Sequence, residues 1–268
     1  MKLRYLHFIQ ILLIILSTVL SSTLTFANKR TDQSTYPQSK DNSLKILTNS
    51  GYITGYSECK RSPLWVNYVL SKKRFKKWPK RRPAFKPDPR TNSHLTPDDY
   101  WLSGYDRGHL APGYGIWTIA GKKARIETYL MSNIVPQSKK LNQKLWQRLE
   151  EVATTYFTRY FEKVNVYTGP IYITSTYLDS GVRVPDSLYK IFFGIKNNKI
   201  KVLSFIMPQQ VSGKESLSHY VVSVNDVENA TGLDFFSYLS NSEQSSFENN
   251  VNLKPWNLVN LSNLPGRY

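Results

Sequence analysis

The pattern of apolar and polar positions predicts several short strands around one long helix. Apolar, aromatic and β-branched residues alternate or cluster between turn signals in five stretches, and such stretches are typical of strands. We expect strands at 65–70, 164–168, 171–176, 189–195 and 201–207.

Apolar residues at a spacing of three and four indicate a helix over 143–161. The residues that define this face are Leu145, Leu149, Val152, Tyr156 and Tyr160. A shorter helix is predicted over 124–130. Strands lie before and after the long helix, and strand and helix do not alternate regularly. The pattern therefore favours an α+β fold over a doubly wound one.

The first 27 residues differ from the rest of the chain. Lys2 and Arg4 precede an apolar run over 8–20, and small residues follow up to Ala27. This order is typical of a secretory signal peptide, and the run is short for a membrane-spanning helix. We therefore expect cleavage before Asn28 and a secreted or periplasmic protein, with an uncleaved membrane anchor as the alternative.

The remainder is predicted to form one domain. Residues 28–44 are polar with few large apolar side chains, which indicates a disordered lead-in, and the domain is expected over 45–262. A chain of 268 residues, 40% of them hydrophobic, can bury one sizeable core. The single cysteine, Cys59, has no partner for an internal disulfide, so stability has to come from packing.

The charge of the chain points to polyanionic partners. The formal net charge is +17, and loss of Lys2 and Arg4 with the leader lowers it to +15. Over 72–82, eight of eleven residues are basic, and Phe75 and Trp78 lie among them. Two interpretations of this run stay open: a surface on which bases stack beside phosphate contacts, or a solvated basic loop that binds any polyanion weakly.

The sequence YDRGHLAP over 105–112 brings together groups that phosphodiester hydrolysis requires. His109 can accept a proton near neutral pH, and the guanidinium of Arg107 matches phosphate oxygens. Gly108 would allow a turn or a close approach of substrate, and Asp106 could orient a neighbouring side chain. Taken alone, four residues of this kind also fit a surface turn.

A second motif follows over 130–150, LMSNIVPQSKKLNQKLWQRLE. Asn133, Asn142 and Glu150 carry oxygen donors of the kind that Mg²⁺ accepts, and they also fit ordinary caps and solvated helix positions. On a straight helix, Asn142 and Glu150 would lie roughly 12 Å apart on flanks about 80° apart, so both cannot bind one ion directly. Either Asn142 lies at the helix entrance or Glu150 acts through metal-bound water, and the two are compatible.

These motifs resemble the DNA/RNA non-specific endonucleases, the ββα-metal nucleases that include secreted bacterial nucleases and mitochondrial endonuclease G. The resemblance extends to GYITGY and PLWVNYVL upstream and to VYTGPIY, VPDSLYKIFF and SVNDVENATGLDFF downstream, so it covers roughly 51–236. It implies a ββα-metal nuclease fold with a central, mainly antiparallel sheet flanked by helices.

The resemblance also implies roles for individual residues. His109 would be the general base, Arg107 would bind phosphate, and Glu150 would hold metal-bound water as a third catalytic residue. Asn142 would be the direct protein ligand of Mg²⁺, for which Mn²⁺ could substitute. Asn133 would support the site and contribute to substrate binding, together with an arginine before an aromatic and an Asp-Pro pair. That arginine is assigned to Arg82, with the adjacent Arg81 as the alternative.

The expected protein is an exported, Mg²⁺-dependent, sugar-non-specific endonuclease that cuts DNA and RNA to 5′-phosphate products. The alternative is an inactive secreted nucleic-acid-binding or uptake protein on the same scaffold. No stable membrane association is expected if the leader is cleaved. A homodimer and an inhibitor protein are open as further partners.

Overall fold

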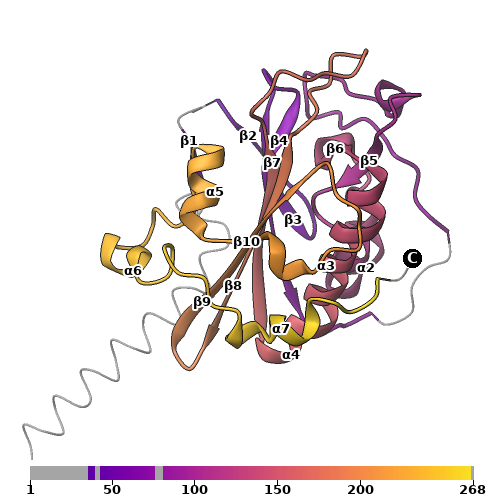
Figure 1. The fold of residues 1–268 in the computed structure, drawn as a ribbon. Helices are drawn as coiled ribbons and strands as arrows, with labels where there is room; N and C mark the ends of the chain where they lie inside the picture. The colour runs from indigo at the N-terminus through magenta and orange to yellow at the C-terminus, as the bar shows by residue number, and fades with distance from the viewer. Residues whose placement is uncertain (1–35, 40–42, 76–80, 267–268) are drawn as a thin grey trace, which may run out of the picture.

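The computed structural model describes residues 36–39, 43–75 and 81–266, and its centre is a seven-stranded antiparallel sheet (Figure 1). The strand order across this sheet is β10-β9-β8-β7-β4-β3-β2. The strands in chain order are β2 (Lys45–Thr48), β3 (Tyr52–Ser57), β4 (Ser62–Ser71), β7 (Lys163–Ile171), β8 (Ser187–Lys196), β9 (Lys199–Pro208) and β10 (Val221–Val222).

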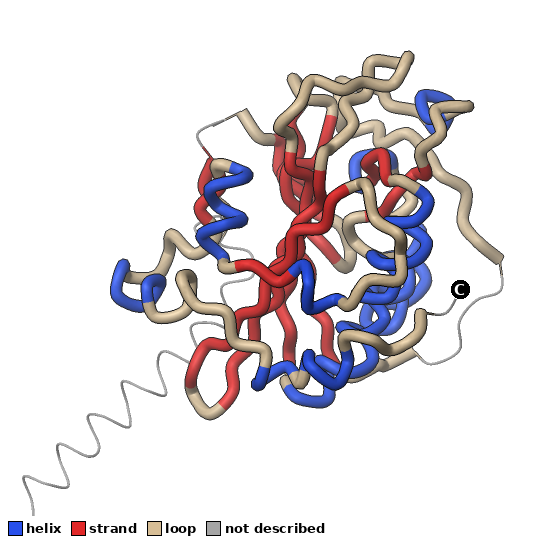
Figure 2. Tube along the Cα trace, viewed as in Figure 1, coloured by secondary structure: helices blue, strands red, loops and turns tan. Residues whose placement is uncertain are grey.

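Helices lie on both faces of the sheet, so the domain has three layers (Figure 2). One face carries α2 (Gly113–Glu127) and a long helical run made of η5 (Leu141–Trp146), α3 (Gln147–Val152), η6 (Ala153–Phe157) and α4 (Thr158–Tyr160). The other face carries α5 (Val224–Thr231) and α6 (Asn241–Ser245). The short helices are η3 (Pro97–Tyr100), η4 (Met131–Asn133), η7 (Leu217–Tyr220), η8 (Lys254–Trp256) and α7 (Leu258–Leu261).

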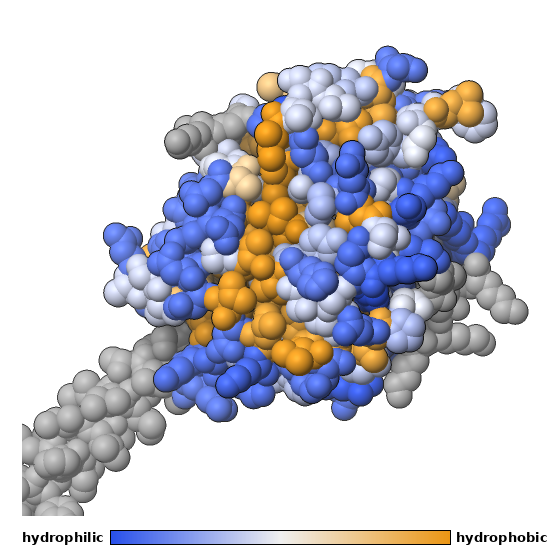
Figure 3. All heavy atoms as spheres, viewed as in Figure 1, coloured by the Kyte–Doolittle hydropathy of each residue, from blue (hydrophilic) through white to orange (hydrophobic). Residues whose placement is uncertain are grey.

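Strand alternation explains the two cores. In β8, Leu188 and Phe192 pack in the core beneath the long helical run, whereas Tyr189 and Ile191 pack in the core beneath α5. Successive side chains of a strand point to opposite faces, so a strand covered on both faces is apolar throughout. In the view of Figure 3, hydrophobic residues form a band down the middle of the molecule with polar residues on either side.

Four predicted strands and the long helix are confirmed with longer bounds. β4, β7, β8 and β9 contain the predicted stretches, and the predicted helix corresponds to the run Leu141–Tyr160. The strand predicted at 171–176 is wrong. β7 ends at Ile171, and the amides of Ile173 and Thr174 donate to the Asp186 carboxylate at 2.7 and 2.9 Å instead of pairing with a strand.

The shorter predicted helix, 124–130, is misplaced, because α2 begins at Gly113 and ends at Glu127. Three glycines, Gly113, Gly115 and Gly121, weaken the helical signal of this element. Gly121 has φ +79°, which interrupts the helix and hides its continuity from the sequence pattern. The sequence pattern also missed β2 and β3.

A separate two-stranded sheet lies beside the helical run. It pairs β5 (Asp106–His109) with β6 (Ile134–Gln137) in antiparallel register. It is called the β5–β6 hairpin below, although α2 and η4 lie between its two strands in the chain. A small core lies beneath it, formed by Leu95, Tyr100, Met131, Ile134, Leu178, Val182 and Val184. This core fixes the hairpin against η3, η4 and the loop over 178–184, and so positions the residues of the YDRGH motif.

The beginning of the chain is described only in part. The predicted signal peptide, 1–27, lies outside the described residues, as does most of the predicted lead-in. Within the lead-in, β1 (Gln38–Ser39) pairs with β11 (Leu233–Asp234), and the Tyr36 ring lies 5.2 Å from that of Trp65. Over the described ranges, no helix has the length and apolar character needed to span a membrane.

Candidate active site

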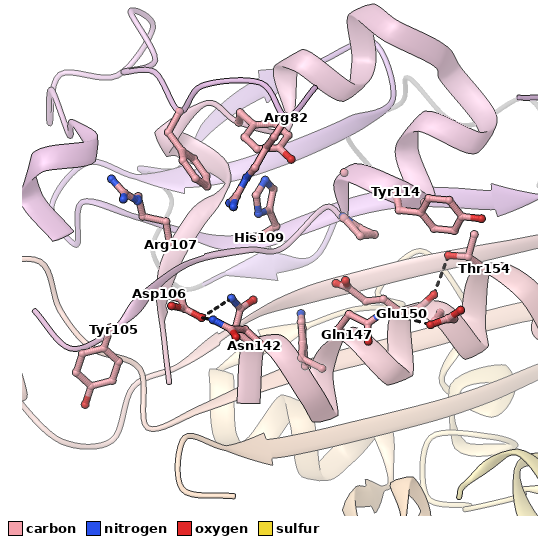
Figure 4. Close-up of a pocket in the computed structure, with 18 residues that line it drawn as sticks. Arg82, Tyr105, Asp106, Arg107, His109, Tyr114, Asn142, Gln147, Glu150 and Thr154 are labelled. Atoms are coloured by element: carbon pink, nitrogen blue, oxygen red, sulfur yellow. Dashed lines mark hydrogen bonds between the residues drawn. The ribbon is translucent and has the colours of Figure 1, made fainter. Parts of the chain in front are cut away.

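A pocket of about 630 Å³ opens between the β5–β6 hairpin and the long helical run (Figure 4). Five of the six residues predicted for the site line it: Arg82, Arg107, His109, Asn142 and Glu150. The sixth, Asn133, does not. The pocket therefore unites the two motifs, 105–112 and 130–150, which are separate in the sequence.

Strand geometry places Arg107 and His109 together. They are two residues apart on β5, so their side chains leave the same face of the hairpin. Gly108 lies between them, and a Cβ there would come within 2.1 Å of the Gln137 side chain. The glycine is thus required by the packing of Gln137, and neither a turn nor substrate approach explains it.

An aromatic ring organises the cationic wall of the pocket. The Phe85 ring centroid lies 5.1 Å from the Arg82 guanidinium and 5.3 Å from that of Arg107. It also lies 5.4 Å from the His109 ring. Cations favour the face of an aromatic ring, so Phe85 holds both guanidinium groups beside the imidazole.

The structure distinguishes the two candidate arginines before Phe85. Arg82 lines the pocket and packs on both Phe85 and Tyr129. The Arg81 carbonyl accepts a hydrogen bond from Arg125 at 3.0 Å, and Arg81 does not line the pocket. Arg82 is therefore the arginine available to a ligand there. Of the basic run that ends at these arginines, 76–80 lie outside the described residues.

The environment of His109 favours its neutral form. Its ring packs edge-on to Tyr129 at 4.6 Å, and its Nε2 is buried with no hydrogen-bond partner. Burial, and secondarily the positive charge of Arg82, lower the pKa of His109 to about 3. The imidazole is therefore neutral at neutral pH, as a proton acceptor must be, and its lowered pKa makes it a weaker base than an ordinary histidine.

Asn142 is oriented by Asp106, which leaves β5 on the face opposite to Arg107 and His109. The Asp106 carboxylate accepts hydrogen bonds from Asn142 Nδ2 at 2.9 Å and from Gln143 Nε2 at 2.8 Å. Because the amide nitrogen is held in this way, Oδ1 is the atom of Asn142 that can bind a cation. The sequence had suggested an orienting role for Asp106 without identifying its partner.

Glu150 is tied to a residue that sequence reasoning missed. Its Oε1 accepts a hydrogen bond from Lys190 Nζ at 3.2 Å, in an ion pair whose lysine side chain is 0% exposed. Burial raises the pKa of Glu150 and lowers that of Lys190, while each charge favours ionisation of the other. Lys190 lies in an apolar strand forty residues away, and no motif marks it.

The helical run carries its pocket residues along one face. Residues four apart line the pocket from Asn142 through Trp146 and Glu150 to Thr154. The segments η5 and η6 are π-helical, and their wider turns hold more residues than α-helical ones. The offset of about 80° expected for a straight α-helix is therefore reduced, and Figure 4 shows Asn142 and Glu150 on the side of the helix that faces the hairpin. Asn142 lies in the first turn of the run, which agrees with the prediction that it stands at the helix entrance.

Asn133 has a different place from the predicted one. Its side chain is 0% exposed, accepts a hydrogen bond from the Ala111 amide, and donates to the carbonyls of Ala111 and Thr128. These three bonds occupy both amide hydrogens, so the assignment of Asn133 to substrate binding is wrong. Asn133 instead fixes the backbone that follows His109.

Comparison with known proteins establishes the family. The sequence model of the DNA/RNA non-specific endonucleases matches residues 28–242. The chain belongs to this family. The resemblance stated from the sequence is thereby confirmed.

Individual nucleases of the family show how far the similarity extends. Nuclease EXOG, mitochondrial, of Mus musculus is 32% identical over 72% of this chain and 57% of its own length. Nuclease C1 of Cunninghamella echinulata is 32% identical over 72% of this chain and 83% of its own. Endonuclease G, mitochondrial, of Homo sapiens is 29% identical over 71% of this chain and 69% of its own length. The matched part thus spans little more than half of mouse EXOG.

The fold agrees with the family. A chain in a crystal structure of the EndoG/EndoGI complex superimposes with a TM-score of 0.61 at 28% identity, covering 74% of this chain and 88% of that one. The α+β prediction with a mainly antiparallel sheet, and the ββα-metal nuclease fold implied by the resemblance, are confirmed.

The pocket of this family member suits a hard divalent cation. In the described part of the chain, no three His, Cys, Asp or Glu side chains form a cluster that could hold a metal. The oxygen donors that line the pocket include the amide oxygen of Asn142 and the carboxylate of Glu150. Mg²⁺ prefers oxygen ligands and keeps several of its waters, so one amide ligand with a carboxylate beside the water shell fits it.

Proposed function

We propose that this protein is a Mg²⁺-dependent endonuclease that hydrolyses phosphodiester bonds in both DNA and RNA. The observation that carries the proposal is the half-buried imidazole of His109, set beside two arginines and facing Asn142 and Glu150 across one pocket. Family membership supports the reaction class.

In the proposed mechanism, Arg82 and Arg107 bind the phosphate that is to be cut. Their planar guanidinium groups match phosphate oxygens, and Phe85 keeps them in place. Backbone phosphate contacts carry no sequence information, which agrees with broad specificity. The charge of +17 supports attraction of polyanions and a strong salt dependence of binding.

His109 acts as the general base. Its imidazole takes a proton from a water molecule in the pocket, and the resulting hydroxide attacks phosphorus opposite the leaving 3′ oxygen, so that products carry 5′ phosphates. A bound Mg²⁺ supplies stabilisation of the negative charge on that leaving oxygen. Asn142 would hold the ion, with Mn²⁺ as a substitute, and Glu150 would hold its water shell.

We further propose export through the leader at 1–27, which gives a secreted or periplasmic enzyme without stable membrane association. The n-region, apolar run and small residues before Asn28 support this localisation. The names of EXOG and endonuclease G place those relatives in mitochondria, a different location from the one proposed here. Cell fractionation and the N-terminal sequence of the mature protein test it.

We also propose that the enzyme can have protein partners, on the basis of the structural similarity to EndoG. EndoG is seen in complex with EndoGI, in a study of EndoG inhibition. An inhibitor protein is therefore a reasonable partner for a nuclease of this family, and a homodimer is an alternative assembly. Size-exclusion chromatography with light scattering tests the homodimer directly.

The decisive experiment incubates the purified protein with plasmid DNA and with RNA, in Mg²⁺ or in EDTA, beside His109→Ala. We expect metal-dependent loss of both polymers and little cutting by the variant. If both polymers stay intact but are retarded on a gel, the protein is an inactive nucleic-acid-binding or uptake protein and the proposal fails.

A further inference from the structure

Lys190 is a buried cation in the middle of the central sheet. It lies on β8 between Leu188 and Phe192, on the face that packs against the long helical run, and its side chain is 0% exposed. A buried charge needs a partner and hydrogen bonds to remain in the interior. Its surroundings therefore indicate what the lysine is for.

The contacts of Lys190 lead to the pocket. Its Nζ donates to Glu150 Oε1 and to the Tyr68 hydroxyl, each at 3.2 Å, and lies 4.3 Å from the Trp146 ring centroid. Glu150 and Trp146 both line the pocket. Lys190 thus contacts the pocket wall from behind, without lining the pocket itself.

Stability of the fold does not explain this lysine. Buried ion pairs are often replaced by apolar residues without loss of stability, and Lys190 has apolar neighbours of the main core on either side in its strand. The pair instead connects one oxygen of a pocket carboxylate to β8, which is hydrogen-bonded to a strand on each side in the central sheet. Glu150 itself stands between two π-helical segments, where the helix is less regular.

We propose that Lys190 is a positioning residue for the nuclease site, which fixes the direction of the Glu150 carboxylate opposite Asn142 so that the pocket binds a hydrated divalent cation. This inference rests on the function proposed above. Charge repulsion alone predicts that removal of Lys190 tightens cation binding. If Lys190 positions Glu150, its removal weakens cation binding instead.

The test measures Mn²⁺ binding to the purified protein without nucleic acid, by the electron paramagnetic resonance signal of free Mn²⁺. Lys190→Met removes the charge at similar length, and Tyr68→Phe removes the other hydrogen-bond partner as a matched control. We expect Lys190→Met to weaken Mn²⁺ binding by about tenfold or more, as loss of residues that orient metal ligands does. Tyr68→Phe should stay within about twofold.

A double variant separates positioning from folding. Lys190→Met leaves Glu150 as an unpaired buried group, whereas Lys190→Met with Glu150→Gln leaves no uncompensated charge and should fold even if the single variant does not. If Lys190 acts through Glu150, the double variant binds Mn²⁺ at least as tightly as Glu150→Gln alone.

Three results would overturn the inference: Lys190→Met with wild-type Mn²⁺ binding, Lys190→Met with tighter binding, or a double variant weaker than Glu150→Gln. The Mg²⁺ concentration for half-maximal cleavage should rise in Lys190→Met in parallel with the loss of Mn²⁺ affinity. Failure of the wild-type protein to cut nucleic acid would overturn the proposed function, and the Mn²⁺ comparison would remain interpretable without it.

Discussion

The neighbouring charges on the two walls of the pocket act in opposite ways relative to burial. On the hairpin wall, burial and the positive charge of Arg82 both lower the pKa of His109, so both favour the neutral imidazole. On the helix wall, burial raises the pKa of Glu150, while the charge and the hydrogen bond of Lys190 oppose that rise. The comparison teaches that a neighbouring charge can act with burial or against it on the protonation of a site residue.

The strongest way to break the comparison is to remove the base. His109→Ala should lower kcat by about 10²- to 10⁴-fold, the usual contribution of a general base. Substrate binding should persist, because the arginines that contact phosphate remain. Single-turnover cleavage and gel retardation measure the two effects, and an alanine variant that retains most of its rate would exclude His109 as the base.

The second test compares neighbouring arginines. Arg82→Ala should weaken substrate binding by roughly tenfold or more, since a charged hydrogen bond to phosphate is lost. Arg81→Ala is the matched control, because it removes the same charge from a residue that does not line the pocket. Affinities measured in EDTA at one salt concentration check this, and equal effects of the two variants would reduce both to general electrostatic attraction.

These assignments show how far the sequence could lead. Arg107 and His109 lie two residues apart in one motif and on one strand face, so the local sequence pattern was sufficient to assign both to the same site. The choice of Arg82 over Arg81 depends on how Phe85 packs, and Lys190 reaches Glu150 only because β8 lies beneath the helix. Asn133 has the residue type of a ligand, but its full burial depends on tertiary packing and could not be predicted from the local sequence.

A third test concerns the packing of the hairpin wall. Gly108→Ala should reduce the unfolding free energy by about 1–3 kcal/mol, because its Cβ would overlap the Gln137 side chain. It should also displace Arg107 and His109 relative to Phe85, with a parallel fall in kcat. Gly113→Ala is the control for the unfolding measurement, because this glycine also lacks a positive φ and a Cβ there meets nothing closer than 3.4 Å. Urea unfolding measures the stability of both variants.

The smallest expected effect is on the acid side of the pH profile. Because the pKa of His109 is lowered from 6.5 to about 3, the imidazole stays neutral as pH falls from 7 to 5. For the free enzyme, kcat/KM should therefore change by no more than about twofold over that interval. A fall centred near pH 6.5 would show that His109 titrates as an ordinary histidine and that the two walls are not electrostatically distinct.

The pairing of β4 with β7 concentrates the pocket in one part of the chain. Ser71 and Lys163 pair across the sheet, so 72–162 leave the sheet and return to it at a single point. This one segment contains all the residues that line the pocket, whereas Lys190 belongs to the sheet beneath it. The Glu150–Lys190 pair is therefore a direct polar link between the segment that forms the pocket and the sheet that supports it.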